Sequence, residues 1–265
     1  MHRERSVSIA MLFKKELAVA RDAARKAGEI QLARQSETVQ TELKSDFSPV
    51  TEVDKQCEAL IQKKLCNAFP QDGFFGEETG IDEGASGRRW IVDPLDGTRP
   101  YLRGIPTYST LIALEINNEY VLGVIHFPAR GETYWAARGS GAFCNNKPIH
   151  VSQTDEISQV MGSCLGIVEE AETEAGRKLL SFMREWNYAY GFMDALSYMY
   201  CASGKLDVCI SLIDKPWDRA AAACIVTEAG GTYSDLSGKH TIHSSSFAVS
   251  NGRFHSDIIT RFSTL

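Results

Sequence analysis

Two aspartates three residues apart mark the part of this chain best suited to chemistry. Asp93 and Asp96 belong to the hexapeptide 93–98, DPLDGT, which ends in Gly97 and Thr98. Glycine lets backbone N–H groups come close to a ligand, and a helix that starts after it would favour a bound anion. Carboxylates that attract hard cations, placed beside N–H groups that attract an anion, suggest metal-assisted phosphate chemistry.

Two further acidic segments could contribute to such a site. Glu77 and Glu78 follow an apolar Phe-Phe pair, and Asp218 lies where a helix should begin. Each segment alone has an ordinary explanation. A glutamate pair in a loop is usually solvated surface, an aspartate before a helix is usually its N-cap, and Asp93 could simply form an Asx turn.

Two helices and a strand are expected to position these acids in the first half of the chain. Apolar residues recur at three- and four-residue spacing over 9–34 and 52–67, which predicts helices with one buried face. Thr51 is a suitable cap for the second helix. The apolar segment 89–92 predicts a buried strand that leads into Asp93. Further strands are expected at 108–116, 120–127 and 132–138, and an Asp/Gly/Ser-rich loop at 80–87.

The second half of the chain is expected to be mixed α/β. Polar residues at 152–158 mark a plausible boundary, so we divide the chain into an N-terminal half, 1–151, and a C-terminal half, 152–265. Beyond the boundary, strands and helices alternate in the pattern. The expected strands are 160–167, 206–212 and 247–249, and the expected helices are 172–186, 194–203 and 218–229.

Composition limits the classes of partner. The chain of 265 residues has a net charge of −6, so no global basic field draws it to nucleic acid. No apolar run approaches the roughly 20 residues that a membrane span requires. Its charged N-terminus lacks the apolar region of a secretion signal, and we expect a cytoplasmic protein.

The cysteines support the same expectation. There are seven of them, an odd number, and no two form a CxxC pair. Most stand in apolar surroundings, where free cysteine is commonly buried. Reduced thiols favour a reducing compartment.

Four motifs in order give the chain a resemblance to the inositol monophosphatase superfamily. They are the segment 44–54 (KSDFSPVTEVD), Gly-Glu-Glu at 76–78, the hexapeptide 93–98, and Trp-Asp-Arg-Ala-Ala at 217–221 followed by Glu-Ala-Gly-Gly. The resemblance covers roughly residues 14–260. It implies an α/β fold, a layered α-β-α-β-α sandwich, and Mg²⁺-dependent hydrolysis of a small phosphate monoester.

The resemblance also implies which residues hold the metal. Glu77, Asp93 and the Leu95 carbonyl would bind one Mg²⁺, and Asp93, Asp96 and Asp218 would bind a second. Asp93 would then bridge the two ions, which explains two carboxylates in one turn. An all-oxygen set of ligands suits Mg²⁺ rather than zinc.

The remaining chemistry is assigned by the same resemblance. The backbone N–H groups of Gly97 and Thr98 would receive the phosphate. The Thr98 hydroxyl, hydrogen-bonded to Asp54, would orient and help to deprotonate the attacking water, and Glu77 is placed with these catalytic residues. No histidine lies in the motifs, so a phosphohistidine intermediate has no candidate nucleophile.

A polar segment before Pro49 is expected to act as a lid. In the family this region folds over the site and can contribute to a third, weaker metal position. Lys44 and Asp46 are the candidates here, with solvated loop charges as the ordinary alternative. The resemblance further implies inhibition by Li⁺ and a homodimer.

The residues after Thr98 resemble the histidinol-phosphatase branch. Arg99 follows directly, and a Gly-x-Pro turn comes at 104–106. In that branch an aspartate at the position of Asp194 faces the substrate and could pair with an ammonium group, although Asp194 could also cap the 194–203 helix. Arg99 could read phosphate or carboxylate. Asp96 and Asp218 are also expected to contact the substrate.

One departure leaves the substrate open. Many family members carry a substrate-contacting glutamate seven residues before the Trp-Asp aspartate, and this chain has Ser211 there. The loss of this carboxylate weakens the case for a cationic or polyol leaving group there. The resemblance to the histidinol-phosphatase branch still favours histidinol phosphate, with inositol 1-phosphate as the alternative and 3′-phosphonucleotides or fructose 1,6-bisphosphate more distant. From other classes, a family member that acts through RNA or protein contacts and a structural protein with coincidental acids stay as competing hypotheses.

Overall fold

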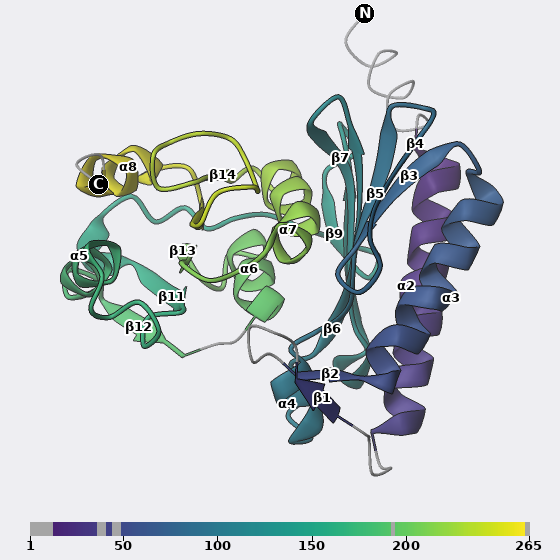
Figure 1. Ribbon diagram of the computed structural model, residues 1–265. Coiled ribbons are helices and arrows are strands. Elements are labelled where there is room, and N and C mark those ends of the chain that lie inside the picture. Colours follow the sequence, from purple (N-terminus) through teal and green to yellow (C-terminus); the bar gives the residue numbers. More distant parts are fainter. Residues whose placement is uncertain (1–12, 36–40, 44–48, 192–193, 263–265) are drawn as a thin grey trace, which may run out of the picture.

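Two sheets and three layers of helices make up the part of the chain that the structure describes (Figure 1). The computed structural model describes residues 13–35, 41–43, 49–191 and 194–262. The larger sheet has eight strands in the order β10-β9-β8-β7-β6-β5-β3-β4, and the smaller has five in the order β12-β11-β13-β15-β14. A short ribbon pairs β1 (Thr41–Leu43) with β2 (Pro49–Thr51).

The larger sheet is mostly antiparallel. Only β3 and β5 among its paired strands run parallel. Its strands are β3 (Asp72–Gly76), β4 (Gly80–Gly84), β5 (Arg88–Asp96), β6 (Ser109–Ile116), β7 (Glu119–Phe127), β8 (Glu132–Ala137), β9 (Ala142–Cys144) and β10 (Lys147–Ile149).

Alternating side chains in these strands separate two cores. Phe74 and Trp90 pack with α2 (Lys14–Arg34) and α3 (Glu52–Ala68), which cover one face of the larger sheet. Their sequence neighbours Phe75 and Ile91 point to the other face. Successive strand residues face opposite sides of a sheet, so apolar residues in consecutive positions require helices on both faces.

The second face of the larger sheet is covered by α6 (Asp194–Ala202) and α7 (Pro216–Glu228). These helices also pack against the smaller sheet, which consists of β11 (Met161–Leu165), β12 (Tyr188–Tyr190), β13 (Val208–Ser211), β14 (Thr232–Ser234) and β15 (Phe247–Ser250). The outer face of that sheet holds α5 (Glu174–Met183) and α8 (His255–Phe262). The predicted α-β-α-β-α sandwich is confirmed.

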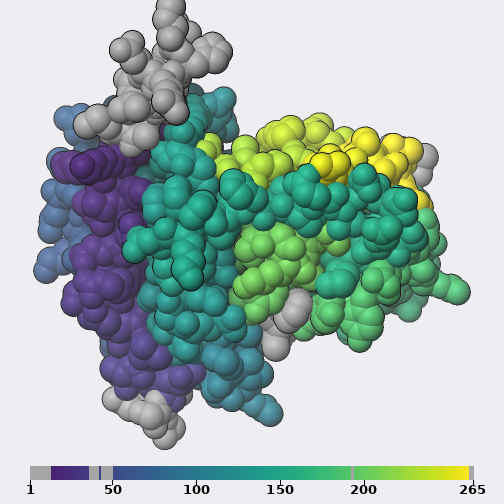
Figure 2. All heavy atoms as spheres, turned by 180° about the vertical axis from the view of Figure 1, so that it is seen from behind, coloured from purple at the N-terminus to yellow at the C-terminus, as the bar shows by residue number. Residues whose placement is uncertain are grey.

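Figure 2 shows the layers from the opposite side. Purple and blue N-terminal residues form one side of the molecule, and green and yellow C-terminal residues form the other. The predicted boundary at 152–158 lies between β10, the last strand of the larger sheet along the chain, and β11, the first strand of the smaller sheet. The division into 1–151 and 152–265 stays a prediction.

The predicted elements agree with the observed ones apart from their ends and one segment. The loop expected at 80–87 is wrong for 80–84, where β4 pairs antiparallel with β3 at the sheet edge. All but the first of its residues are exposed, so no apolar alternation reveals the strand. The start of the helix expected at 9–34 lies partly outside the described residues, and α2 is seen from Lys14.

The thiols and the helices add two plain observations. All seven cysteines are free; four are buried, and Cys66 is exposed. Within the described residues, no helix combines the length and the apolar character needed to cross a membrane.

A groove of small residues seats α7 on the larger sheet. Ala113, Gly123 and Ala136 are neighbours across β6, β7 and β8. A Cβ at Gly123 would lie 2.5 Å from the carbonyl oxygen of Ala221 in α7. The helix therefore approaches the sheet as closely as backbone atoms allow, and this contact sets the position of Asp218 at its start.

Replacing Gly123 by alanine should force α7 away from the sheet. We expect the free energy of unfolding to fall by about 1–3 kcal/mol, as in other overpacked cores, and metal affinity to weaken because Asp218 moves. Urea denaturation and calorimetric titration with Mg²⁺ measure the two effects. Gly191→Ala is the control, since its Cβ would meet nothing within 4 Å. Equal stability of both variants would contradict the packing argument.

Candidate metal and phosphate site

The end of β5 delivers both aspartates of the hexapeptide. Between the paired positions Asp93 and Asp96, β5 advances three residues while β6 advances two, so the strand bulges there. The backbone N–H of Leu95 donates to Asp93 Oδ1 at 2.9 Å. The Asx turn considered for Asp93 is therefore present, and it leaves the other carboxylate oxygen available for the site.

Helix α2 supports this turn through a glutamine that the sequence did not single out. Gln31 is fully buried and donates through Nε2 to the Pro94 carbonyl and to Thr110 Oγ1, both at 2.8 Å. Thr110 Oγ1 also lies 3.1 Å from the Pro94 carbonyl. In the sequence, Gln31 could be recognised only as a polar residue on the predicted buried face of the helix. Helical periodicity cannot reveal its hydrogen-bond partner Pro94, which lies 63 residues away in the chain.

Three carboxylates from two distant parts of the chain meet at this bulge. Ligand atoms of Asp93, Asp96 and Asp218 all lie within 4.8 Å of one another. Asp218 is the third residue of α7, and its Oδ2 accepts the backbone N–H of Lys215 at 2.7 Å. The helix starts at Pro216, two residues before the predicted start, so Asp218 caps from inside the first turn and still reaches the cluster.

The raised pKa values of these carboxyl groups indicate that the cluster would be stabilised by a bound cation. Burial raises the pKa of Asp93 well above its ordinary value, and the charges of Glu77, Asp218 and Asp96 raise it further. Burial likewise raises the pKa of Asp218, with Asp214 and Glu77 adding to the rise. Neighbouring carboxylates resist joint ionisation without a cation. Their oxygen-only donors fit a hard divalent ion such as Mg²⁺.

Asp96 is oriented by donors from both halves of the chain. Its Oδ2 accepts the hydroxyl of Ser109 at 3.0 Å and the backbone N–H of Ala195 at 3.2 Å. Burial raises the pKa of Asp96 well above its ordinary value, and the charges of Asp194 and Asp218 act in the same direction. The side chain is therefore held in place before any ligand arrives.

The loop that carries Glu77 is held by a second acid that sequence reasoning missed. Glu58 of α3 is buried, and its carboxylate accepts the backbone N–H groups of Glu78 at 3.0 Å and Thr79 at 2.8 Å. A Cβ at Gly76 would lie 2.6 Å from that carboxylate, so a larger residue there would displace it from the loop. In the sequence, Glu58 could have been recognised as a charged residue on the buried side of a predicted helix, where a charge needs a partner.

Glu58→Gln should loosen this loop. A glutamine keeps one acceptor but presents N–H groups to the second backbone donor. We expect kcat/KM to fall about tenfold through a misplaced Glu77, and stability to fall by about 1 kcal/mol as a part-buried backbone donor loses its partner. Steady-state assays and urea denaturation test this. Glu174→Gln, at an exposed ion pair with Lys178, is the control.

The proposed water-orienting pair is also in contact. Thr98 Oγ1 lies 3.3 Å from Asp54 Oδ1 and 3.2 Å from the Leu95 carbonyl oxygen. Asp54 is the third residue of α3, and its Oδ2 accepts the backbone N–H of Thr51 at 2.8 Å, which completes the capping box that Thr51 forms. Burial raises the pKa of Asp54 to about 6.

Gly97 makes the turn between the metal cluster and the first helical residue, Thr98. Its φ of 76° lies in the left-handed region, which glycine adopts without strain. Helix α4 (Thr98–Leu102) starts directly after it. The structure thus brings the predicted phosphate-binding and metal-binding residues to one place.

The residue order and this geometry agree with a known family. Residues 14–265 match the inositol monophosphatase family. The chain belongs to this family. A histidinol-phosphatase of Chlorobaculum parvum is 40% identical over 233 residues, which cover 86% of this chain and 88% of that protein.

Two further comparisons agree. A histidinol-phosphatase of Streptomyces coelicolor is 40% identical over 235 residues, covering 83% of this chain and 86% of that protein. The extragenic suppressor protein suhB of Bartonella henselae has a structure with a TM-score of 0.87 and 31% identity, covering 94% of this chain and 98% of that one. The resemblance inferred from the motifs is confirmed, and this inositol monophosphatase family member is a metal-dependent phosphatase.

The family motif does not include all that surrounds the site. Asp194 is the first residue of α6, and its φ of 53° lies in the left-handed region. Burial raises its pKa to about 6, Asp214 contributes to the rise, and Arg99 opposes it. Ser211 is buried at the end of β13, and its Oγ accepts the backbone N–H of Asp214 at 3.1 Å. The predicted lid residues, Lys44 and Asp46, lie outside the described residues.

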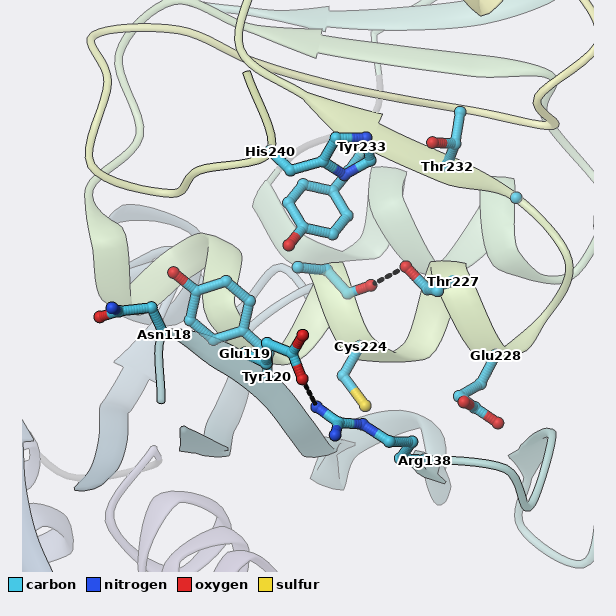
Figure 3. A pocket seen from close by; sticks show the side chains of 12 residues that line it. Asn118, Glu119, Tyr120, Arg138, Cys224, Thr227, Glu228, Thr232, Tyr233 and His240 are labelled. Carbon is cyan, nitrogen blue, oxygen red and sulfur yellow. Dashed lines mark hydrogen bonds and ion pairs between the residues drawn. The ribbon is translucent and has the colours of Figure 1, made fainter. Parts of the chain in front are cut away.

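A separate cavity of about 490 Å³ opens at the other end of α7 (Figure 3). It is lined by residues of β7, α7 and β14 and by Arg138, which follows β8 and forms an ion pair with Glu119. Glu228, another lining residue, lies ten residues after Asp218, or roughly 15 Å along the helix. None of the predicted site residues lines this cavity.

Proposed function

We propose that this family phosphatase uses Mg²⁺ to hydrolyse histidinol phosphate by attack of water on phosphorus. The cluster of Asp93, Asp96 and Asp218, with oxygens within 4.8 Å of one another, carries the proposal for the reaction. Glu77, Asp93 and the Leu95 carbonyl would hold one ion. Asp93, Asp96 and Asp218 would hold the second.

The protein's own groups account for the other requirements of hydrolysis. When bound, divalent ions attract phosphate oxygens, lower the pKa of water and stabilise a leaving alkoxide. The backbone N–H groups of Gly97 and Thr98 would receive the phosphate. The Thr98 hydroxyl would orient the attacking water, and Asp54, whose pKa burial raises to about 6, is suited to take up its proton near neutral pH.

The identity of the substrate rests on the relatives and on nearby charge. Two relatives that are 40% identical to this chain are named histidinol-phosphatase. Histidinol phosphate carries an ammonium group, which suits a site with acidic side chains such as Asp194 beside the metal cluster. Arg99 would contact the phosphate, and Asp96 and Asp218 would face the substrate as well as the metal.

A substrate panel tests the proposal. Purified protein with Mg²⁺ would receive histidinol phosphate, inositol 1-phosphate, 3′-phosphoadenosine 5′-phosphate and fructose 1,6-bisphosphate, and released phosphate would be measured. We expect the highest kcat/KM for histidinol phosphate. Higher kcat/KM for inositol 1-phosphate would reject the substrate and keep the reaction class. Failure to release phosphate from any compound would reject the proposed activity.

Other properties implied by the family stay predictions. Inhibition by Li⁺ is measured in the same assay, and light scattering reports whether the protein is a homodimer. A third Mg²⁺ held with the help of Lys44 and Asp46 would appear as a weaker binding step in calorimetry. A cytoplasmic location and the lack of a nucleic-acid partner stay predictions that rest on composition alone.

A further inference from the structure

An additional carboxylate, Asp214, is fixed beside the metal cluster. It lies in the turn between β13 and α7. Its backbone N–H donates to Ser211 Oγ at 3.1 Å, and its Oδ2 accepts the hydroxyl of Tyr198 from α6. Residues of two elements, β13 and α6, therefore hold Asp214 in place.

The negative charge of Asp214 acts on three other acids of the site. It raises the pKa of Asp194, and it adds to the rise that burial causes in the pKa of Asp96 and of Asp218. Asp214 is nevertheless outside the group of three carboxylates that meet within 4.8 Å. Its partner Tyr198 stands one helical turn after Asp194 in α6, and Asp214 itself lies four residues before Asp218, so its contacts place it between these two acids without assigning it a metal position.

The nearest buried cation does not neutralise Asp214 by a hydrogen bond. Arg219 is fully buried, and its Nη1 donates to the carbonyl oxygens of Ile242 and Ser244. Its Nε and Nη2 have no hydrogen-bond partner among the described residues. Burial raises the pKa of Asp214, and the guanidinium, which lies over the Phe247 ring 5.7 Å from its centroid, opposes that rise only as a neighbouring charge.

Asp194 offers an oxygen that lacks a donor. Its Oδ2 is buried and has no hydrogen-bond partner among the described residues. A Cβ at Gly97 would lie 3.1 Å from this oxygen, so the oxygen is next to the turn assigned to the phosphate. A buried acceptor without a donor costs free energy, and the positive φ of Asp194 is a strain that structures retain at ligand sites.

We propose that Asp214 and Asp194 together bind the ammonium group of the alcohol that leaves the phosphate. An ammonium group has three donors, and its hydrogen bonds to carboxylates are stronger than those of a neutral hydroxyl. The pair would therefore select phosphate monoesters of amino alcohols. This inference rests on the proposed phosphatase reaction and adds a specificity-determining residue, Asp214, that the family motifs do not contain.

Two substrates that differ only in the amine test the assignment. Histidinol phosphate and its deamino analogue would be compared in the Mg²⁺-loaded wild type, Asp214→Asn and Asp155→Asn. We expect Asp214→Asn to lower the kcat/KM ratio of amine to deamino substrate at least tenfold, mainly through KM. Asp155, an exposed acid paired loosely with Arg253 at 3.9 Å, controls for the loss of one charge.

Tyr198→Phe distinguishes binding of the ammonium group by Asp214 from the support that Tyr198 gives to Asp214. It removes the hydroxyl that holds Asp214 and keeps the carboxylate, so we expect the same ratio to fall by a smaller factor. An equal loss on both substrates in Asp214→Asn would show a structural role and overturn the inference. An unchanged ratio would overturn it as well.

A measurement of histidinol binding tests the ammonium subsite even if the protein shows no phosphatase activity. If the wild type hydrolyses no phosphate ester, the proposed function fails. Calorimetric titration of histidinol with Mg²⁺ and inorganic phosphate present then decides the subsite. Binding at least tenfold weaker in Asp214→Asn than in the wild type supports the ammonium subsite, and equal affinity overturns it.

Discussion

Asp96→Asn is expected to abolish turnover and leave the fold intact. The asparagine keeps the size of the side chain and its contacts with Ser109 and the N-terminus of α6. It removes one negative charge from the three-carboxylate cluster and one strong ligand for a hard cation. We expect kcat to fall by roughly a thousandfold or more, because metal-assisted hydrolysis depends on the bound ion.

The measurement combines kinetics with calorimetry. Mg²⁺ binding should weaken in parallel with kcat, and circular dichroism should be unchanged. Asp155→Asn, which removes an exposed carboxylate, is the matched control and should behave as the wild type. Near-wild-type rates for Asp96→Asn at saturating Mg²⁺ would refute the metal scheme.

The metal-free protein is expected to gain stability when the pH is lowered from 8 towards 6. Burial and mutual repulsion raise the folded-state pKa of Asp93, Asp96 and Asp218, and burial raises that of Asp54 to about 6. A carboxyl group with a raised folded pKa binds protons more tightly in the folded state. Stability from these groups is therefore gained as the pH falls through their folded pKa values and lost as it rises.

Two histidines oppose this trend, and a difference measurement removes them. Burial lowers the pKa of His126 and of His255, the latter to about 4, so both destabilise the fold as the pH falls through their unfolded values. They are unchanged in Asp96→Asn. In chelator, we expect this variant to be more stable than the wild type at pH 8, with the advantage shrinking towards pH 6.

Added Mg²⁺ should reverse the order of the two proteins. A ligand at a hundred times its Kd stabilises a fold by about 2.7 kcal/mol, and the variant should gain much less. Thermal unfolding with chelator and with Mg²⁺ gives all four values. A wild type that is more stable than Asp96→Asn in chelator at pH 8 would show that the carboxylates do not repel one another.

The sequence predicted the acidic cluster better than the residues that support it. Asp93, Asp96 and Asp218 stand in short motifs whose order is informative, and the structure brings them together. Gln31 and Glu58 stand in ordinary helical patterns, and their partners are backbone groups 20 or more residues away. Such contacts depend on tertiary packing, which residue type and spacing do not encode.

The same reasoning explains the mistake at the edge of the larger sheet. An interior strand shows its buried faces as apolar residues, as at Trp90, Ile91 and Val92. Strand β4 is mostly exposed, so its Gly, Asp and Glu residues resemble a loop. Asp214 belongs to none of the motifs, because its contact with Tyr198 arises only when the turn before α7 packs against α6.

The seating of α7 on the larger sheet has a consequence for the order of folding. Asp93 and Asp218 are about 120 residues apart in the chain. Contacts between such distant residues form slowly, because a long loop must close before they repay its entropy. The metal-binding cluster can therefore exist only after α7 has docked at Gly123. During refolding, Mg²⁺ binding should therefore recover later than the circular dichroism signal of the helices. The delay would report the time at which α7 docks on the larger sheet.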